Sequence, residues 1–200
     1  MQIAAALHYR LLKLYAVVLL TLGRRPDALQ RLKRMLLLQP ADRYALASQA
    51  HLQAEQLDFE AAIASLQRLI SVWPQDAPAW FNLGYVLQQT GRHADAVPAF
   101  RSALALEPLM DRAWYGLGLA LMHRQQFHEA AEALKKNTAL QPMSPYGWYR
   151  LAEVWLALDQ PEDAQKVLRH LRQFEPAVAA QLEHQYCTFF TVPKAPDGTH

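Results

Sequence analysis

The sequence contains little cysteine and little glycine. Cys187 is the only cysteine among 200 residues, which excludes an internal disulfide framework. The expected compartment is therefore a reducing one such as the cytoplasm, with the periplasm left open because one cysteine is compatible with both. Only seven glycines accompany a hydrophobic content of 52%, driven by alanine and leucine. This balance is typical of an all-helical chain.

Long apolar runs are also missing. The most apolar stretch, residues 14–22 (LYAVVLLTL), follows Arg10 and Lys13 as the core of a signal peptide would. No small-x-small cleavage site comes after it, because the next residues are GRRPDALQR. The stretch is far too short to span a membrane. We therefore predict that it belongs to the first helix of the protein.

Signatures of catalysis are absent from the sequence. It has no glycine-rich phosphate loop, no G-x-S-x-G and no H-E-x-x-H. His184 and Cys187 are three residues apart and could share a metal, but two ligands do not make a zinc site, and we favour a surface pair. The net charge of +2 is too small to indicate nucleic acid binding. We predict no enzymatic activity, no cofactor and no metal.

What the sequence does contain is a repeat with a period of 34 residues. Prolines recur at that spacing, at Pro40, Pro74, Pro108, Pro142 and Pro176. Alanines recur in the same register, at Ala28, Ala62, Ala96, Ala130 and Ala164. A small residue recurs at Ala16, Ala50, Gly84, Gly118 and Ala152, and a large apolar one at Leu32, Leu66, Phe100, Leu134 and Leu168. Agreement of several columns at one period predicts a repeat protein.

The unit from Ala79 to Pro108 shows the pattern most fully. It contains W-x-x-L-G from Trp80, A-x-x-x-F from Ala96, and a final proline. This pattern resembles the tetratricopeptide repeat (TPR) family, whose units are pairs of helices. The resemblance implies an all-α fold, a right-handed α-solenoid in which small residues let the paired helices approach closely.

The period divides the chain into five predicted repeats, followed by a capping helix at about 177–190 and a flexible tail at 191–200. The predicted repeats are 9–42, 43–76, 77–110, 111–144 and 145–178, and together with the cap they make a single domain of residues 1–190. Asp42, Asp76, Asp111 and Ser144 occupy positions where they would cap first helices. Gln49, Gln53 and Asn137 replace apolar or small residues, which predicts weak joints in the stack.

In the TPR family, one stripe of each first helix lines a concave groove that holds partner peptides. Carried over column by column, the resemblance implies a groove containing Tyr44, His51, Phe81, Asn82, Tyr85, Gln88, Gln89, Arg112, Tyr115, Leu119, Met122, Tyr146, Tyr149 and Arg150. Lys13, Ala47 and Glu153 lie in the same columns. Tyrosine and arginine are frequent binding hot spots, so we predict a binding surface; the alternative is that the tyrosines shield joints between helices.

Charge is distributed unevenly along the chain. Residues 1–40 contain seven basic residues and one acidic residue, Asp27, a net charge of +6. A basic N-terminal unit could contact an acidic partner, a phosphate or an anionic membrane, and the simpler interpretation is a solvated outer face.

These observations predict a non-catalytic module, an adaptor, assembly factor or chaperone, that binds an extended or helical peptide segment of another protein. Val17 occupies the column where TPR domains that clamp chaperone tails carry an asparagine, so we do not expect such tails as partners. The alternatives are a self-associating structural solenoid and an accessory subunit of an enzyme complex. We expect neither a nucleic acid partner nor a membrane span.

Overall fold

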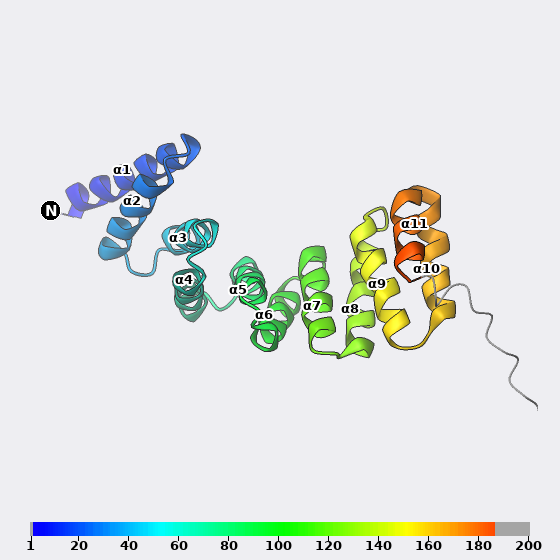
Figure 1. Ribbon diagram of the computed structural model, residues 1–200. Helices are drawn as coiled ribbons and strands as arrows, with labels where there is room; N and C mark the ends of the chain where they lie inside the picture. Colours follow the sequence, from blue (N-terminus) through cyan, green and yellow to red (C-terminus); the bar gives the residue numbers. More distant parts are fainter. Residues whose placement is uncertain (1, 187–200) are drawn as a thin grey trace, which may run out of the picture. The chain divides into compact units, whose positions relative to one another are not determined.

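A computed structural model describes the backbone of residues 2–186 and the side chains from Leu7 to Tyr186 (Figure 1). The described part is all-helical, as predicted. Its helices are α1 (Gln2–Thr21), α2 (Arg25–Leu38), α3 (Arg43–Glu55), α4 (Phe59–Val72), α5 (Ala77–Gln89), α6 (His93–Leu106), α7 (Asp111–His123), α8 (Phe127–Leu140), α9 (Pro145–Ala157), α10 (Pro161–Phe174) and α11 (Pro176–Gln185).

The chain divides into two compact units, Met1–Pro108 and Leu109–His200. In the first unit, helices α1 to α6 pack as three successive pairs, and each later pair also contacts the one before it. In the second unit, α7 pairs with α8 and α9 with α10, and α11 packs against α10 and α9. That residues 1–190 form a single domain stays a prediction, and the predicted tail at 191–200 lies outside the described residues.

The turns inside the helix pairs each contain a residue in the left-handed backbone conformation. Gly23, Leu57, Gly91, Gln125 and Asp159, each 34 residues from the next, have positive φ angles between 56° and 73°. Glycine adopts this left-handed conformation freely, whereas other residues adopt it at a cost of about 1 kcal/mol. The period therefore fixes the turn geometry even where glycine is absent.

Replacing Leu57 by glycine is expected to stabilise the protein. Leu57 has a φ of 62° and a side chain that is 73% exposed, so the change relieves backbone strain without removing packing. We expect a gain of up to about 1 kcal/mol in the free energy of unfolding, reduced somewhat by the extra freedom of glycine in the unfolded chain. Chemical denaturation of the variant measures it; Leu37→Gly on α2, equally exposed but in helical conformation, should destabilise instead.

The helix starts follow the sequence prediction only in part. Asp42 and Asp76 accept hydrogen bonds from the amides of Ala45 (2.6 Å) and Ala79 (3.0 Å), as predicted. Asp111 is not a cap, because Met110 precedes the helix and Asp111 is its first residue; Ser144 is at the cap position, but its hydroxyl makes no capping bond. One cap was not predicted: Asp58 accepts from the amide of Ala61 at 3.3 Å.

The small-residue column allows paired helices to touch. A Cβ atom on Gly84 would lie 2.9 Å from the ring of Phe100, and one on Gly118 would lie 2.7 Å from Leu134. In pairs with alanine at this column, the alanines are fully buried, as Ala16 and Ala152 show. Helix contact at this column is therefore close, and beside Gly84 and Gly118 the neighbouring side chain occupies the space that a Cβ atom would need.

The predicted weak joint in the second repeat contains a small network of polar side chains, and its weakness stays a prediction. Gln53 and Ser65 are buried, and the Ser65 hydroxyl donates to Gln53 Oε1 at 2.7 Å while Gln49 Nε2 donates to Ser65 Oγ at 3.1 Å. The two glutamines are thus linked across α3 and α4 through one hydroxyl. These hydrogen bonds offset the cost of burying the groups that make them, whereas Gln49 Oε1 is buried without a hydrogen-bond partner.

The predicted capping role of the last helix fits what the structure describes of it. In α11, Ala179 and Leu182 are completely buried. An ion pair between Arg172 and Glu183 joins α10 to α11 on the surface. Residues 187–190 of the predicted cap lie outside the described part of the chain. The described helix covers the apolar side of the preceding pair, which a repeat array requires at its end.

Candidate functional site

The fourteen predicted groove residues divide equally between the two units, and none is fully buried. The first unit holds Tyr44, His51, Phe81, Asn82, Tyr85, Gln88 and Gln89. The second holds Arg112, Tyr115, Leu119, Met122, Tyr146, Tyr149 and Arg150. Tyr85 is 46% exposed and Tyr146 is 71% exposed, so both rings are accessible to a partner.

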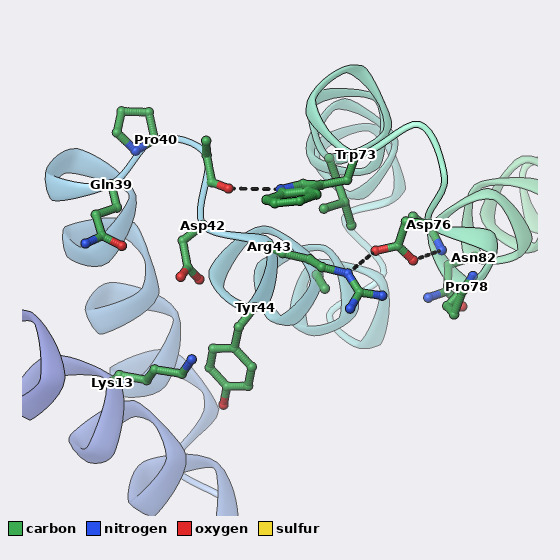
Figure 2. A pocket seen from close by; sticks show the side chains of 14 residues that line it. Lys13, Gln39, Pro40, Asp42, Arg43, Tyr44, Trp73, Asp76, Pro78 and Asn82 are labelled. Atoms are coloured by element: carbon green, nitrogen blue, oxygen red, sulfur yellow. Dashed lines mark hydrogen bonds and ion pairs between the residues drawn. The ribbon is translucent and has the colours of Figure 1, made fainter.

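An open pocket of about 700 Å³ lies in the first unit, where the starts of α3 and α5 face α1 (Figure 2). It brings together the groove positions Lys13, Tyr44, Ala47 and Asn82, which come from three different helices. Its remaining wall comes from the two turns that precede α3 and α5, from the first residues of these helices and from α4. These residues are Gln39, Pro40, Ala41, Asp42, Arg43, Leu69, Trp73, Asp76, Pro78 and Ala79. The sequence did not predict the contribution of these turns.

The two acidic residues of the pocket are already bound. The Tyr9 hydroxyl donates to Asp42 at 2.5 Å, and Arg43 Nε donates to Asp76 at 2.5 Å. Burial, then the hydrogen bond and charge of Asp42, raise the pKa of Tyr9; the hydrogen bond to Asp76 raises the pKa of Arg43. Each carboxylate also caps a helix, so neither is available to a cationic ligand.

The polar groups left available include a cation, Lys13, and the amides of Asn82 and the exposed Gln39. Lys13 Nζ lies 4.9 Å from the centroid of the Tyr44 ring and makes no ion pair with the residues that the structure describes. Asn82 is exposed on the opposite side of the pocket. The Trp73 indole is held in place by its bond from Nε1 to the Ala41 carbonyl (3.0 Å). The pocket therefore presents a positive charge, amides and two aromatic rings.

The other predicted residues of the first unit surround this pocket less closely. Phe81 lies against Phe100, with ring centroids 6.0 Å apart. His51 Nε2 lies 3.6 Å from Glu55, which also binds Arg25. Gln88 is half-buried and Gln89 is exposed, so their amides lie at the surface of α5 beside Tyr85. All five of these side chains, His51 on α3 and four on α5, leave part of their surface open.

In the second unit, Tyr149 and Arg150 make hydrogen bonds near the last helix. Tyr149 Oη donates to Gln185 Oε1 at 2.5 Å, and Tyr186 Oη donates to Glu153 at 3.0 Å. Arg150 donates to the same Glu153 at 2.6 Å. Burial, followed by hydrogen bonding to Glu153, raises the pKa of Tyr186 to about 12. These contacts join α9 to the end of α11 and favour the joint-shielding role for Tyr149 and Arg150.

Sequence reasoning missed Tyr9 and Tyr186, although a signal was present. Tyr9 and Asp42 are 33 residues apart, as are Arg43 and Asp76. Glu153 and Tyr186 have the same separation. A hydrogen-bond donor and an acidic residue separated by 33 residues, one fewer than the repeat period, therefore indicate a bond between the first helices of consecutive repeats.

The described residues contain no cluster of three or more potential metal ligands. The His184–Cys187 pair considered above lies partly outside the described part. No helix within residues 2–186 has both the length and the apolar character needed to cross a bilayer.

Comparison with known proteins identifies the class of protein. Sequence models described as tetratricopeptide repeat match residues 47–106, 83–136 and 145–170. The chain belongs to the tetratricopeptide repeat family. No curated protein matches the sequence.

Solved structures share the fold at low sequence identity. A crystal structure of MamA protein has a TM-score of 0.78 and 19% identity, covering 94% of this chain and 98% of that one. MamA from Desulfovibrio magneticus RS-1 has a TM-score of 0.76 and 22% identity, covering 89% and 96%. YrrB, described as a TPR protein with an unusual peptide-binding site, has a TM-score of 0.77 and 17% identity, covering 85% and 89%.

Proposed function

We propose that this protein is a non-catalytic interaction module that binds an extended segment of a partner protein at the pocket of its first unit. The observation that carries the proposal is the convergence of Lys13, Tyr44 and Asn82 from three helices on one open pocket whose own acids are occupied. The similarity to YrrB, described as having a peptide-binding site, supports the same class of function.

The side chains of the pocket suit a peptide of particular chemistry. An amide such as Asn82 both donates and accepts, so it can pair with a peptide group of an extended chain. The Tyr44 ring and the half-exposed Trp73 offer apolar walls, and Lys13 offers a positive charge. We therefore propose a segment with an acidic or carboxylate group close to an apolar side chain. Its role as an adaptor, assembly factor or chaperone depends on the partner.

A peptide selection tests this proposal. Random peptides displayed on phage are selected on the intact protein, and the enriched peptides are synthesised and measured by fluorescence anisotropy. Asn82→Ala and Tyr44→Ala are each expected to weaken binding about tenfold or more, because central contacts dominate such interfaces.

Two control variants make the result specific. Leu37→Ala changes an exposed residue on α2 outside the pocket, and Tyr146→Ala removes an exposed tyrosine of the second unit. Both are expected to bind as the unchanged protein does. Enriched peptides that bind equally well to Asn82→Ala and Tyr44→Ala would refute the site, and no enrichment at all would count against the module.

A further inference from the structure

Helix α1 has two apolar faces, and only one of them is covered. Leu12, Ala16 and Leu19 are buried on the face toward α2. A second set, spaced at three and four residues and therefore on one side of the helix, is between 41% and 67% exposed: Leu7, Leu11, Leu14, Tyr15, Val18 and Leu22. We call this set the outer face of α1. A contiguous exposed apolar face of this kind marks an interaction site.

The repeat register shows what kind of structure fits this face. Leu11 and Val18 are 55% and 41% exposed. Their equivalents one and two periods later are at most 2% exposed: Ala45 and Leu52 in α3, and Ala79 and Val86 in α5. Because α3 packs against α2 and α5 against α4, those positions are covered by a preceding helix. The outer face of α1 therefore has the geometry that buries a helix elsewhere in this unit.

The outer face is indented as well as apolar. A hollow of about 380 Å³ lies over it, lined by His8, Leu11, Leu12, Leu14, Tyr15 and Val18. Helices pack by inserting the side chains of one into the spaces of the other. A hollow of this kind accepts a projecting side chain, which favours a helix over a flat lipid surface as the occupant.

Charge defines the partner more closely. Helix α1 contains no acidic residue, and Arg10 is exposed without an ion pair among the described residues. The Arg31 guanidinium lies 4.9 Å from the centroid of the Tyr15 ring, and its Nε has no hydrogen-bond acceptor. A second copy of α1 would bring only like charge to this face, whereas an acidic helix would bring complementary charge.

We propose that the outer face of α1 binds an amphipathic helix with an acidic polar side, contributed by a partner protein. The helix would lie along α1 as α2 lies along α3, with its apolar side chains on Leu11, Leu14 and Val18. Its carboxylates would face Arg10 and Arg31. Lys13, which lines the peptide pocket, is on the other side of α1, so this surface is separate from the proposed peptide site.

Two synthetic peptides of about 18 residues, long enough for five helical turns, test the proposal. Both carry the same leucine stripe; one has glutamate and the other lysine at its polar positions. Fluorescence anisotropy with the full chain is expected to show about tenfold or greater preference for the glutamate peptide, and added salt should reduce that preference. Equal binding of both peptides, or no binding of the glutamate peptide, would overturn the proposal.

Substitutions on the outer face and at the two nearby arginines locate the binding. Leu11→Glu combined with Val18→Glu is expected to weaken binding of the glutamate peptide about tenfold or more. Arg10→Glu combined with Arg31→Glu is expected to abolish the preference for the glutamate peptide over the lysine peptide. Leu37→Glu on α2, at an 82% exposed leucine outside the face, is the matched control and should bind normally. Circular dichroism confirms that each variant folds. Unchanged binding by the Leu11 and Val18 double variant would refute the site.

Two further measurements separate this partner from other occupants. Analytical ultracentrifugation compares the unmodified protein with Leu11→Glu. We expect the substitution to leave the oligomeric state unchanged. Sedimentation with phosphatidylserine vesicles compares the unmodified protein with the Leu11 and Val18 double variant. We expect the substitutions to leave vesicle binding unchanged. A dimer or vesicle complex lost in the Leu11 and Val18 double variant would assign the face to a second copy or to a membrane and overturn the proposal.

Discussion

Replacing Phe100 by alanine is expected to lower the free energy of unfolding by about 3–5 kcal/mol, the range seen when a fully buried aromatic ring is removed. Phe100 is completely buried, its ring touches the backbone of Gly84, and its centroid is 6.0 Å from that of Phe81. The cavity would therefore open between α5 and α6 in the centre of a tightly packed pair.

The measurement must resolve local loss of structure. Repeat proteins couple mainly between neighbours, so a change in one pair can unfold locally before the whole chain melts. Native-state hydrogen exchange should therefore show the largest loss of protection in α5 and α6, together with a lower melting temperature. Unchanged exchange in these two helices would show that Phe100 does not hold them together.

A smaller substitution at Phe100 shows how much of the loss in stability comes from the cavity. Phe100→Leu should cost about 1.5 kcal/mol or less, because leucine occupies the same column in Leu32, Leu66 and Leu134. Gly84→Ala alone would force a Cβ to 2.9 Å from the ring. Combined with Phe100→Leu it recreates the alanine–leucine combination of Ala16 with Leu32, so the pair of changes should be less damaging than the sum of the two.

Replacing Gly147 by alanine is expected to cost about 2–4 kcal/mol, although alanine is ordinarily the better helix former. The new Cβ would lie 2.1 Å from Asn137 Oδ1, closer than atoms can approach, and 3.2 Å from Thr138 Cγ2, which is a tight contact. Asn137 is buried, and its Nδ2 donates to the Asp111 carbonyl at 2.9 Å. Moving Asn137 away would break the bond that joins the end of α8 to the start of α7.

The expected rescue is specific. Asn137→Ala in the Gly147→Ala background should recover most of the lost stability, because the two side chains no longer compete for the same space. Chemical denaturation of the four members of this double-mutant cycle measures the coupling. Additive losses would mean that Asn137 and Gly147 do not constrain each other.

Asn137 also shows what its sequence prediction left out. Taken alone, it replaces a small or apolar residue and suggests a weak joint. In the structure the Asn137 amide bonds the Asp111 carbonyl, and the glycine ten residues later leaves the space that its oxygen needs. The prediction missed this because Asn137 was compared with the equivalent residues of the other repeats. It was not compared with Gly147, the residue that it faces in the structure.

Of the fourteen predicted groove residues, Tyr44 and Asn82 line the pocket, and its surroundings did not follow from the sequence. Lys13, Tyr44 and Asn82 follow from their columns, and the structure places them around one pocket. The walls contributed by the turns before α3 and α5 did not follow, because they depend on how one pair sits against the next. In the second unit, contacts of Tyr149 with α11 depend on the position of a helix whose sequence lies outside the repeat pattern.

The sequence by itself determined the class of fold, the helix pairs and the recurring turns, because these depend on spacings within 34 residues. Only the tertiary structure decided which surfaces remain open. Leu11 and Ala45 occupy the same column, yet Leu11 is exposed and Ala45 is buried, since α2 packs against α3 and no helix among the described residues packs in the equivalent way against α1. Burial is a property of neighbours in space, and a periodic sequence assigns the same position to residues whose neighbours differ.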